Sequence, residues 1–236
     1  MKALAGGQED VYRPVKTIDI ERCLRLAVEV PAVLLVVAEV LILFVGIGAR
    51  LFHRPIIWSD ELASILFLWL AMLGAVVALQ RGEHMRLTYF VGAFSPRVQA
   101  GCETLAVGAT FVLLACLLHP AYDYTEDQSF VETPALGWSG TWRALAIPVG
   151  FVLASLSCGL RLVRRSLIDI AGVAMVLAGL AFAFYAGAPL LAQIGNWALL
   201  VFFVGLLGVG VLSGVPIAFS FALATVAYLL AVTSTP

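Results

Sequence analysis

Charged residues are scarce in this sequence. They make up 12% of its 236 residues, whereas 62% are hydrophobic and the mean hydropathy is +1.02. A water-soluble domain of this composition would expose a large apolar surface, which is unfavourable. The formal net charge of −1 also gives no excess of basic residues for binding nucleic-acid phosphates. The composition therefore predicts an integral membrane protein with no nucleic-acid partner.

The motifs of common enzyme classes are missing too. The sequence has no GxSxG, HExxH or Walker-type pattern, which argues against a serine hydrolase, a zinc protease and a P-loop ATPase. Its four cysteines have no CxxC spacing and are expected to be small buried hydrophobic residues. The three histidines lie near different helix ends on both predicted sides of the membrane, which disfavours haem ligation. We therefore expect no enzyme activity, no cofactor and no metal site in this chain.

Long apolar runs are what the sequence does contain. A helix needs about 20 mostly apolar residues to cross a bilayer. The candidate runs are 26–49, 62–79, 105–118, 144–163 and 167–190. A last run, 197–232, is interrupted by Ser-Gly-Val-Pro at 213–216, where Pro216 removes a backbone donor, so it predicts either two short spans or one broken helix. The expected fold is all-α: a polytopic four-span bundle followed by two to three further hydrophobic helices.

The basic residues are distributed unevenly among the predicted loops. Eleven of the 14 Lys and Arg residues lie in the N-terminal arm, in the second loop and after the fourth span, against three in the first and third loops. By the positive-inside rule, the N-terminus is expected to be cytoplasmic. The second loop also has apolar residues spaced i, i+3, i+4 and i+7 over 87–94, which predicts a short helix lying in the membrane interface.

Glu39 lies near the middle of the first apolar run. An ionisable group at this depth is costly and is therefore a candidate functional residue. Two interpretations are open: a protonatable site or ion ligand, or a neutral carboxylic acid that is hydrogen-bonded to a neighbouring helix. Glu29, ten residues earlier, lies about 80° away round the helix and is not expected to pair with it.

Two stretches resemble the small membrane subunit of tripartite ATP-independent periplasmic (TRAP) transporters. Residues 50–63, RLFHRPIIWSDELA, resemble that family's entry to its second span, with Leu51 where Tyr is usual. Gly74 followed by 81–86, RGEHMR, resembles the exit from the same span, with Thr88 where Asp is common. Within these motifs, Ser59 is expected to cap the second helix. Arg50, Trp58, Glu61 and His84 are the candidates for helix-end and partner contacts.

The tail carries a second resemblance. Residues 212–219, LSGVPIAF, are similar to the opening of the large membrane subunit of the same transporters. The expected organisation is therefore a cytoplasmic arm, a four-span TRAP small-subunit-like domain, a connecting transmembrane helix and a partial large-subunit-like segment. Their boundaries are 1–24, 25–165, 166–193 and 194–236.

The resemblance implies a non-catalytic scaffold in the bacterial inner membrane. Its partners would be a large TRAP membrane subunit, a periplasmic substrate-binding protein and the lipid bilayer. The assembled complex would carry out sodium-driven uptake of an organic acid, such as a C4-dicarboxylate or a sialic-acid-like carboxylate, with sodium bound by the large subunit. Two rival hypotheses are a membrane-anchor subunit of a redox complex and an independent small carrier or channel that uses Glu39.

Overall fold

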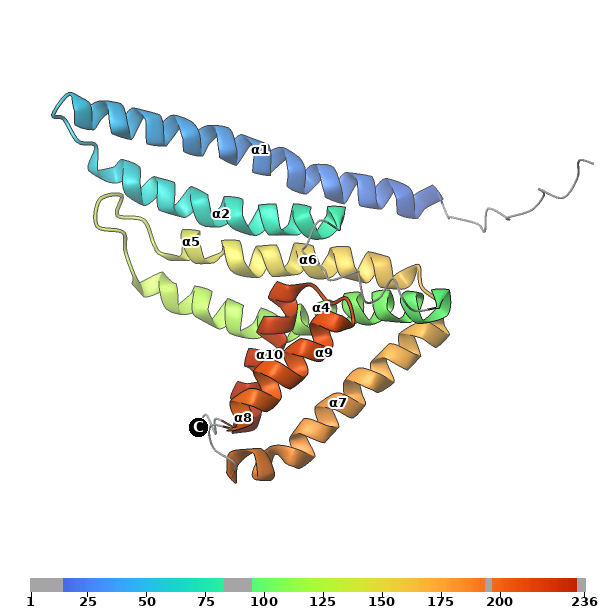
Figure 1. Ribbon diagram of the computed structural model, residues 1–236. Coiled ribbons are helices and arrows are strands. Elements are labelled where there is room, and N and C mark those ends of the chain that lie inside the picture. Colours follow the sequence, from blue (N-terminus) through green and yellow to red (C-terminus); the bar gives the residue numbers. More distant parts are fainter. Residues whose placement is uncertain (1–14, 83–94, 194–196, 233–236) are drawn as a thin grey trace, which may run out of the picture.

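Helices account for most of the molecule (Figure 1). The computed structural model describes residues 15–82, 95–193 and 197–232. In these ranges, five helices are long and apolar enough to cross a membrane, which confirms the expected all-α polytopic fold. The elements are α1 (Val15–Leu51), α2 (Ile57–Arg81), α4 (Pro96–Asp127), η1 (Gln128–Phe130), α5 (Thr141–Ala144), α6 (Ala146–Val163), α7 (Leu167–Gln193), α8 (Trp197–Leu200), the π-helical η2 (Val201–Leu206), α9 (Leu207–Leu212) and α10 (Ile217–Val232).

Local signals explain several helix ends. Pro96 occupies the first turn of α4, where a missing backbone N–H costs nothing, and extended Ser95 precedes it. Gly82 ends α2 in a left-handed conformation (φ 72°), and its N–H reaches the carbonyls of Ala78 and Leu79. The helix predicted from the apolar run 105–118 is too short. In the structure, α4 continues through Pro120 to Asp127. The predicted interfacial helix at 87–94 lies outside the described residues.

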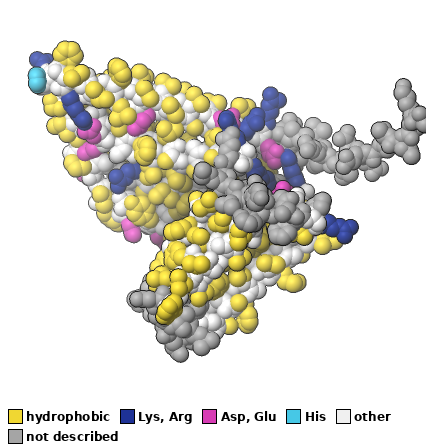
Figure 2. Space-filling model, viewed as in Figure 1, with side chains coloured by type: hydrophobic (Ala, Val, Ile, Leu, Met, Phe, Trp, Pro, Cys, Tyr) yellow, Lys and Arg dark blue, Asp and Glu magenta, His cyan; other side chains and the backbone are white. Residues whose placement is uncertain are grey.

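Four long helices lie side by side in the order α1, α2, α6, α4 (Figure 1). Their shared core consists of aliphatic and small side chains from all four helices. Its buried members are Val28, Ala32, Leu73, Val76, Leu79, Leu114, Ala154 and Cys158. The view in Figure 2 shows hydrophobic side chains over the flank of this layer and charged side chains gathered toward its ends. This distribution fits a layer that stands across a bilayer.

The contact between α1 and α2 follows a regular stripe on α1. The stripe repeats every three or four residues, the spacing of one helix face. It consists of Val28, Ala32, Leu35, Glu39, Ile42 and Gly46, all buried or half-buried. At Gly46 the two helices are so close that an added Cβ would lie 3.1 Å from the Ser59 hydroxyl. α1 is therefore an edge helix with one face on α2 and a broad apolar face left exposed.

The C-terminal apolar run forms a hairpin of two helices. α8, η2 and α9 run one way, and α10 returns beside them. Gly214 (φ 85°) and Pro216 make the turn, and Gly210 lies so close to Ser220 that a Cβ at this position would be 2.9 Å from the Ser220 hydroxyl. Each arm has about 16 residues, or about 24 Å, which is short of the ~30 Å apolar core of a bilayer. The structure thus has two helices rather than one broken helix.

α7 connects the four-helix layer to this hairpin and is poorly covered. It packs along α4 and α10, where Val173 comes close to Gly108. None of the residues in its most apolar stretch is buried, and large side chains such as Met175, Phe182 and Tyr185 are exposed. An apolar helix with so much exposed surface requires lipid or another protein around it.

Candidate functional site at the α1–α2 turn

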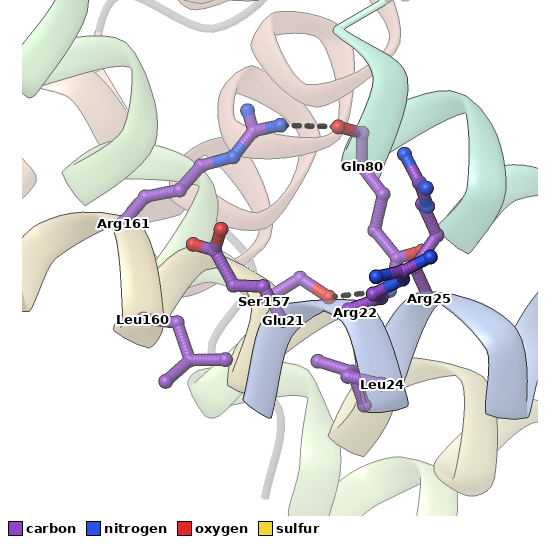
Figure 3. A pocket seen from close by; sticks show the side chains of 8 residues that line it. All are labelled: Glu21, Arg22, Leu24, Arg25, Gln80, Ser157, Leu160 and Arg161. Atoms are coloured by element: carbon purple, nitrogen blue, oxygen red, sulfur yellow. Dashed lines mark hydrogen bonds between the residues drawn. The ribbon is translucent and has the colours of Figure 1, made fainter. Parts of the chain in front are cut away.

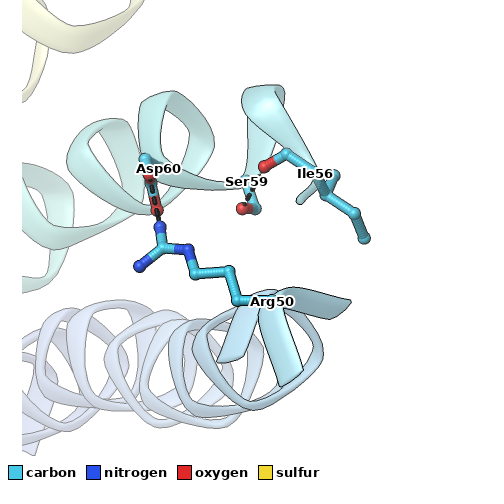
Figure 4. Close-up of polar contacts among 4 residues, drawn as sticks. All are labelled: Arg50, Ile56, Ser59 and Asp60. Carbon is cyan, nitrogen blue, oxygen red and sulfur yellow. Dashed lines mark hydrogen bonds and ion pairs between the residues drawn. The ribbon is translucent and has the colours of Figure 1, made fainter. Parts of the chain in front are cut away.

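An ion pair joins the end of α1 to the start of α2. The Arg50 guanidinium lies 2.5 Å from the Asp60 carboxylate (Figure 4). The turn between the two helices is tight because His53 adopts a left-handed conformation (φ 57°) and the Arg54 N–H bonds back to the Ala49 carbonyl. Arg50 is therefore held at the helix end, and its partner is Asp60, the first of the two acidic residues of the Trp-Ser-Asp-Glu motif.

Ser59 does not cap α2, so that prediction is wrong. The helix begins at Ile57, the capping position is Ile56, and Ser59 already lies in the first turn. The Ser59 hydroxyl donates to the Ile56 carbonyl at 2.7 Å (Figure 4). Ser59 is buried where α1 passes close to it at Gly46. A small side chain is needed there because α1 passes so close, and the hydroxyl satisfies itself on its own helix.

Glu61 anchors a loop that is distant in sequence. Its carboxylate accepts hydrogen bonds from the backbone N–H of Ala135 at 2.8 Å and of Leu136 at 2.9 Å. Two consecutive N–H groups that converge on a carboxylate form a small anion-binding nest, and bonds to a charged acceptor are stronger than neutral ones. Glu61 therefore fixes the loop between η1 and α5 to the first turn of α2.

The anchored loop is itself ordered by a narrow turn. Two hydrogen bonds join Thr133 to Trp138. The Thr133 N–H donates to the Trp138 carbonyl at 2.8 Å, and the Thr133 hydroxyl accepts a hydrogen bond from the Trp138 N–H. Gly137 supplies the left-handed position (φ 63°) that the turn requires. Glu132 and Ser139 form an isolated bridge. The loop presents a defined surface at the same end of the molecule as the α1–α2 turn.

Tryptophans surround this end of the helices. Trp58 is 44% exposed, and Trp138 and Trp142 are exposed as well. Trp69 lies further along α2, and its indole N–H donates to the Trp142 carbonyl at 2.8 Å, which ties α5 to α2. Partly exposed indole rings at the ends of apolar helices favour the headgroup layer. They also provide contact area for a protein partner.

The remaining candidates lie elsewhere. Glu39 is on the α1 face that packs against α2, and its buried Oε2 atom has no hydrogen-bond partner among the described residues. Glu29 pairs with Arg81 at 3.0 Å, a contact that the sequence does not predict. His84 lies outside the described residues. The structure thus brings Arg50, Trp58 and Glu61 together and leaves Glu39 well along α1.

Sequence reasoning missed the partners of the motif. The loop 133–138 contributes backbone N–H groups, which no side-chain pattern reveals, and Trp69 is hidden inside an apolar run. The one available signal was the Thr-Pro-Ala-Leu-Gly-Trp string at 133–138, whose Pro and Gly indicate a turn. Within the described part of the chain, no group of three or more His, Cys, Asp or Glu residues is arranged to hold a metal ion.

These features define a multi-pass helical membrane protein with a polar, Trp-rich assembly at one end of its helix layer. The family model for the DctQ component of tripartite ATP-independent periplasmic transporters matches residues 33–167, more than half of the chain. The protein belongs to this family. It is therefore a membrane subunit of a TRAP transporter and not an enzyme, which removes the redox-anchor hypothesis.

Two curated relatives support the assignment. The sialic acid TRAP transporter small permease protein SiaQ of Vibrio cholerae is 29% identical over 125 residues, which cover 52% of this chain and 72% of SiaQ. The sialic acid TRAP transporter permease protein SiaT of Haemophilus influenzae is 30% identical over 107 residues, which cover 45% of this chain and 17% of SiaT. The family match ends at residue 167, where α7 begins.

Proposed function

We propose that this subunit is a scaffold in the bacterial inner membrane. It orients a large TRAP membrane subunit and contributes a docking surface for a periplasmic substrate-binding protein. The observation that carries the proposal is the Glu61 anchor, because it fixes a loop to a helix end without creating a chemical centre. A rigid, Trp-rich surface of this kind is suited to protein contact.

The exposed apolar faces support a role in assembly with a large membrane subunit. α7 packs on α4, η2 and α10 but has no buried residue in its most apolar stretch, and the hairpin arms are too short to span a bilayer alone. Their exposed faces would pack against further helices of a large subunit. In this proposal, 166–193 is the connecting helix, and 194–236 is a partial large-subunit-like segment that follows the four-span domain 25–165.

The distribution of charge supports a cytoplasmic N-terminus. Basic residues of α1, α2 and α6 meet at the end of the layer opposite Glu61, where Arg81 pairs with Glu29, and Arg164 pairs with Glu21. The positive-inside rule assigns that end to the cytoplasm. The Glu61 loop and the Arg50–Asp60 pair then face the periplasm, where a binding protein would dock.

The substrate class in this proposal is an organic acid. Sialic acid appears in the names of both relatives. Sialic-acid-like carboxylates are therefore favoured over C4-dicarboxylates as the transported substrate. Uptake would be driven by sodium bound at the large subunit, with no cofactor in this chain. This division of roles agrees with a site made of helix-end contacts.

Co-purification tests the proposed assembly. The tagged chain is extracted from its native membranes in mild detergent, and the associated proteins are identified by mass spectrometry. Recovery of a large polytopic permease is expected, and a chain recovered alone would contradict the scaffold role. A Glu61→Ala variant run in parallel shows whether the anchored loop contributes to recovery of a soluble binding protein.

Independent transport through Glu39 is the second candidate function. The observation in its favour is the buried Oε2 atom, which has no hydrogen-bond partner among the described residues. A carrier would use that carboxylate to bind a proton or an ion. Uptake by the isolated chain that is lost on Glu39→Gln substitution would establish this function instead.

A further inference from the structure

A basic cavity lies at the end of the helix layer opposite Glu61. It has a volume of about 320 Å³ and lies between the start of α1 and the ends of α2 and α6 (Figure 3). The lining residues are Glu21, Arg22, Leu24, Arg25, Gln80, Ser157, Leu160 and Arg161. Segments of three helices thus contribute to one open, polar cavity.

The cavity has an excess of positive charge. Arg22, Arg25 and Arg161 face one acidic residue, Glu21, whose carboxylate is already paired with Arg164 at 2.7 Å. Arg22 and Arg25 are exposed and form no ion pair or hydrogen bond with another described residue. Two adjacent guanidinium groups without a carboxylate partner are suited to bind a phosphate group.

The wall of the cavity is organised by hydrogen bonds. Arg161 donates to the Gln80 carbonyl at 2.6 Å, and the Gln80 side-chain amide donates to the Ser157 hydroxyl at 3.1 Å (Figure 3). The amide oxygen of Gln80, Oε1, is buried and has no hydrogen-bond partner among the described residues. An unpartnered acceptor on a residue of the cavity wall favours a ligand that carries a hydroxyl donor next to its phosphate.

The position of the cavity identifies the source of that phosphate. Leu24 and Leu160 line it, and the exposed apolar face of α1 begins beside it with Leu26, Val30 and Val33. Acyl chains that lie along this face of α1 would bring a lipid headgroup to the three arginines. Basic pockets between transmembrane helices are known to bind anionic headgroups.

We propose that this cavity binds the headgroup of an anionic phospholipid of the phosphatidylglycerol type. Its phosphate contacts Arg22, Arg25 and Arg161, and a headgroup hydroxyl reaches toward Gln80. The lipid joins α1 to α6, two helices that otherwise contact each other little. This inference depends on the membrane location of the chain and not on its proposed scaffold function.

Native mass spectrometry of the delipidated full chain, titrated with phosphatidylglycerol or phosphatidylcholine in detergent, tests the proposal. Wild-type protein should retain phosphatidylglycerol preferentially. The double variant Arg22→Gln, Arg25→Gln should bind it roughly tenfold or more weakly, because each basic residue contributes about a few-fold in affinity or more. The charge-preserving Arg22→Lys, Arg25→Lys variant should keep most of the binding.

Arg97→Gln is the matched control, because Arg97 is exposed at the start of α4 and does not line the cavity. It should leave lipid binding unchanged. Equal binding of the two lipids, or undiminished phosphatidylglycerol binding by the double Gln variant, would overturn the proposal. Displacement of the lipid by equimolar glycerol phosphate would also overturn it, because the site would then select a soluble phosphate.

Discussion

The Glu61 carboxylate and the backbone N–H of Ala135 lie 2.8 Å apart although 74 residues separate them. This contact, with its neighbour at Leu136, fastens the loop before α5 to the first turn of α2. Three residues of the Trp-Ser-Asp-Glu motif thereby have a structural role. Asp60 holds the end of α1, Ser59 allows α1 to approach, and Glu61 holds the loop.

Glu61→Ala should loosen this loop without unfolding the helices. Loss of the charged acceptor removes the hydrogen bonds of two N–H groups that are not buried, at a cost of about 0.5–1.5 kcal/mol in the free energy of unfolding. Hydrogen exchange of amides 133–138 in detergent should accelerate, whereas exchange in α2 and α6 should not. Glu126→Gln, at an exposed position in α4, is the control, and a loop that stays protected in Glu61→Ala would contradict the anchoring role.

The Arg50–Asp60 pair should contribute little to stability. Its side chains are 54% and 66% exposed, and exposed ion pairs typically contribute about 0.2–1 kcal/mol. A double-mutant cycle with Arg50→Gln and Asp60→Asn, measured by thermal unfolding, should give a coupling energy in that range. A coupling of several kcal/mol would show instead that this pair is shielded from water, for example by a partner or by lipid.

Gly46→Leu should separate α1 from α2, because an added Cβ already meets the Ser59 hydroxyl at 3.1 Å. Overpacking of this kind costs about 1–3 kcal/mol. Gly48→Leu provides the matched control, since a Cβ at Gly48 meets nothing within 4 Å and leucine favours helix. The lower melting temperature should therefore appear for Gly46→Leu alone, and equal melting of the two variants would contradict the close α1–α2 approach.

Glu39→Gln distinguishes the scaffold from the independent carrier. The amide has nearly the same shape as a neutral carboxylic acid, so under the scaffold proposal the substitution should change the melting temperature little and preserve uptake by the assembled transporter. Glu29→Gln is the comparison. Glu29 lies on the same helix as Glu39, and its substitution removes the ion-pair partner of Arg81. Loss of uptake in Glu39→Gln, with normal uptake in Glu29→Gln, would assign transport chemistry to Glu39.

The sequence predicts the helices better than it predicts their contacts. Long apolar runs indicate transmembrane helices because a helix that crosses a bilayer needs about 20 mostly apolar residues and little else. The Gly-Val-Pro string marks the break at residues 214–216. The prediction that Ser59 caps α2 is wrong because the capping residue is set by where the helix begins. α2 begins at Ile57, so Ile56 is the N-cap residue. The partners of Glu61 are backbone groups of a distant loop, which depend on the packing of α2 beside α5 and α6.

Pairing between α1 and α2 could be inferred only in part. The spacing from Val28 to Gly46 indicates one helix face. The sequence does not indicate which helix packs on that face, because apolar helices in a bilayer pack through shape rather than through hydrophobicity. The same limitation applies to α7. Its uniform apolar surface carries no periodic signal that distinguishes the side facing α4 from the side facing lipid.

Uptake by reconstituted proteoliposomes tests the central claim most directly. Vesicles are prepared with the large permease and the binding protein, with and without this chain, and with this chain alone, under an inward sodium gradient and with labelled sialic acid or C4-dicarboxylates. The scaffold account predicts sodium-dependent uptake only when all three proteins are present. Undiminished uptake without this chain, or uptake by this chain alone, would contradict it.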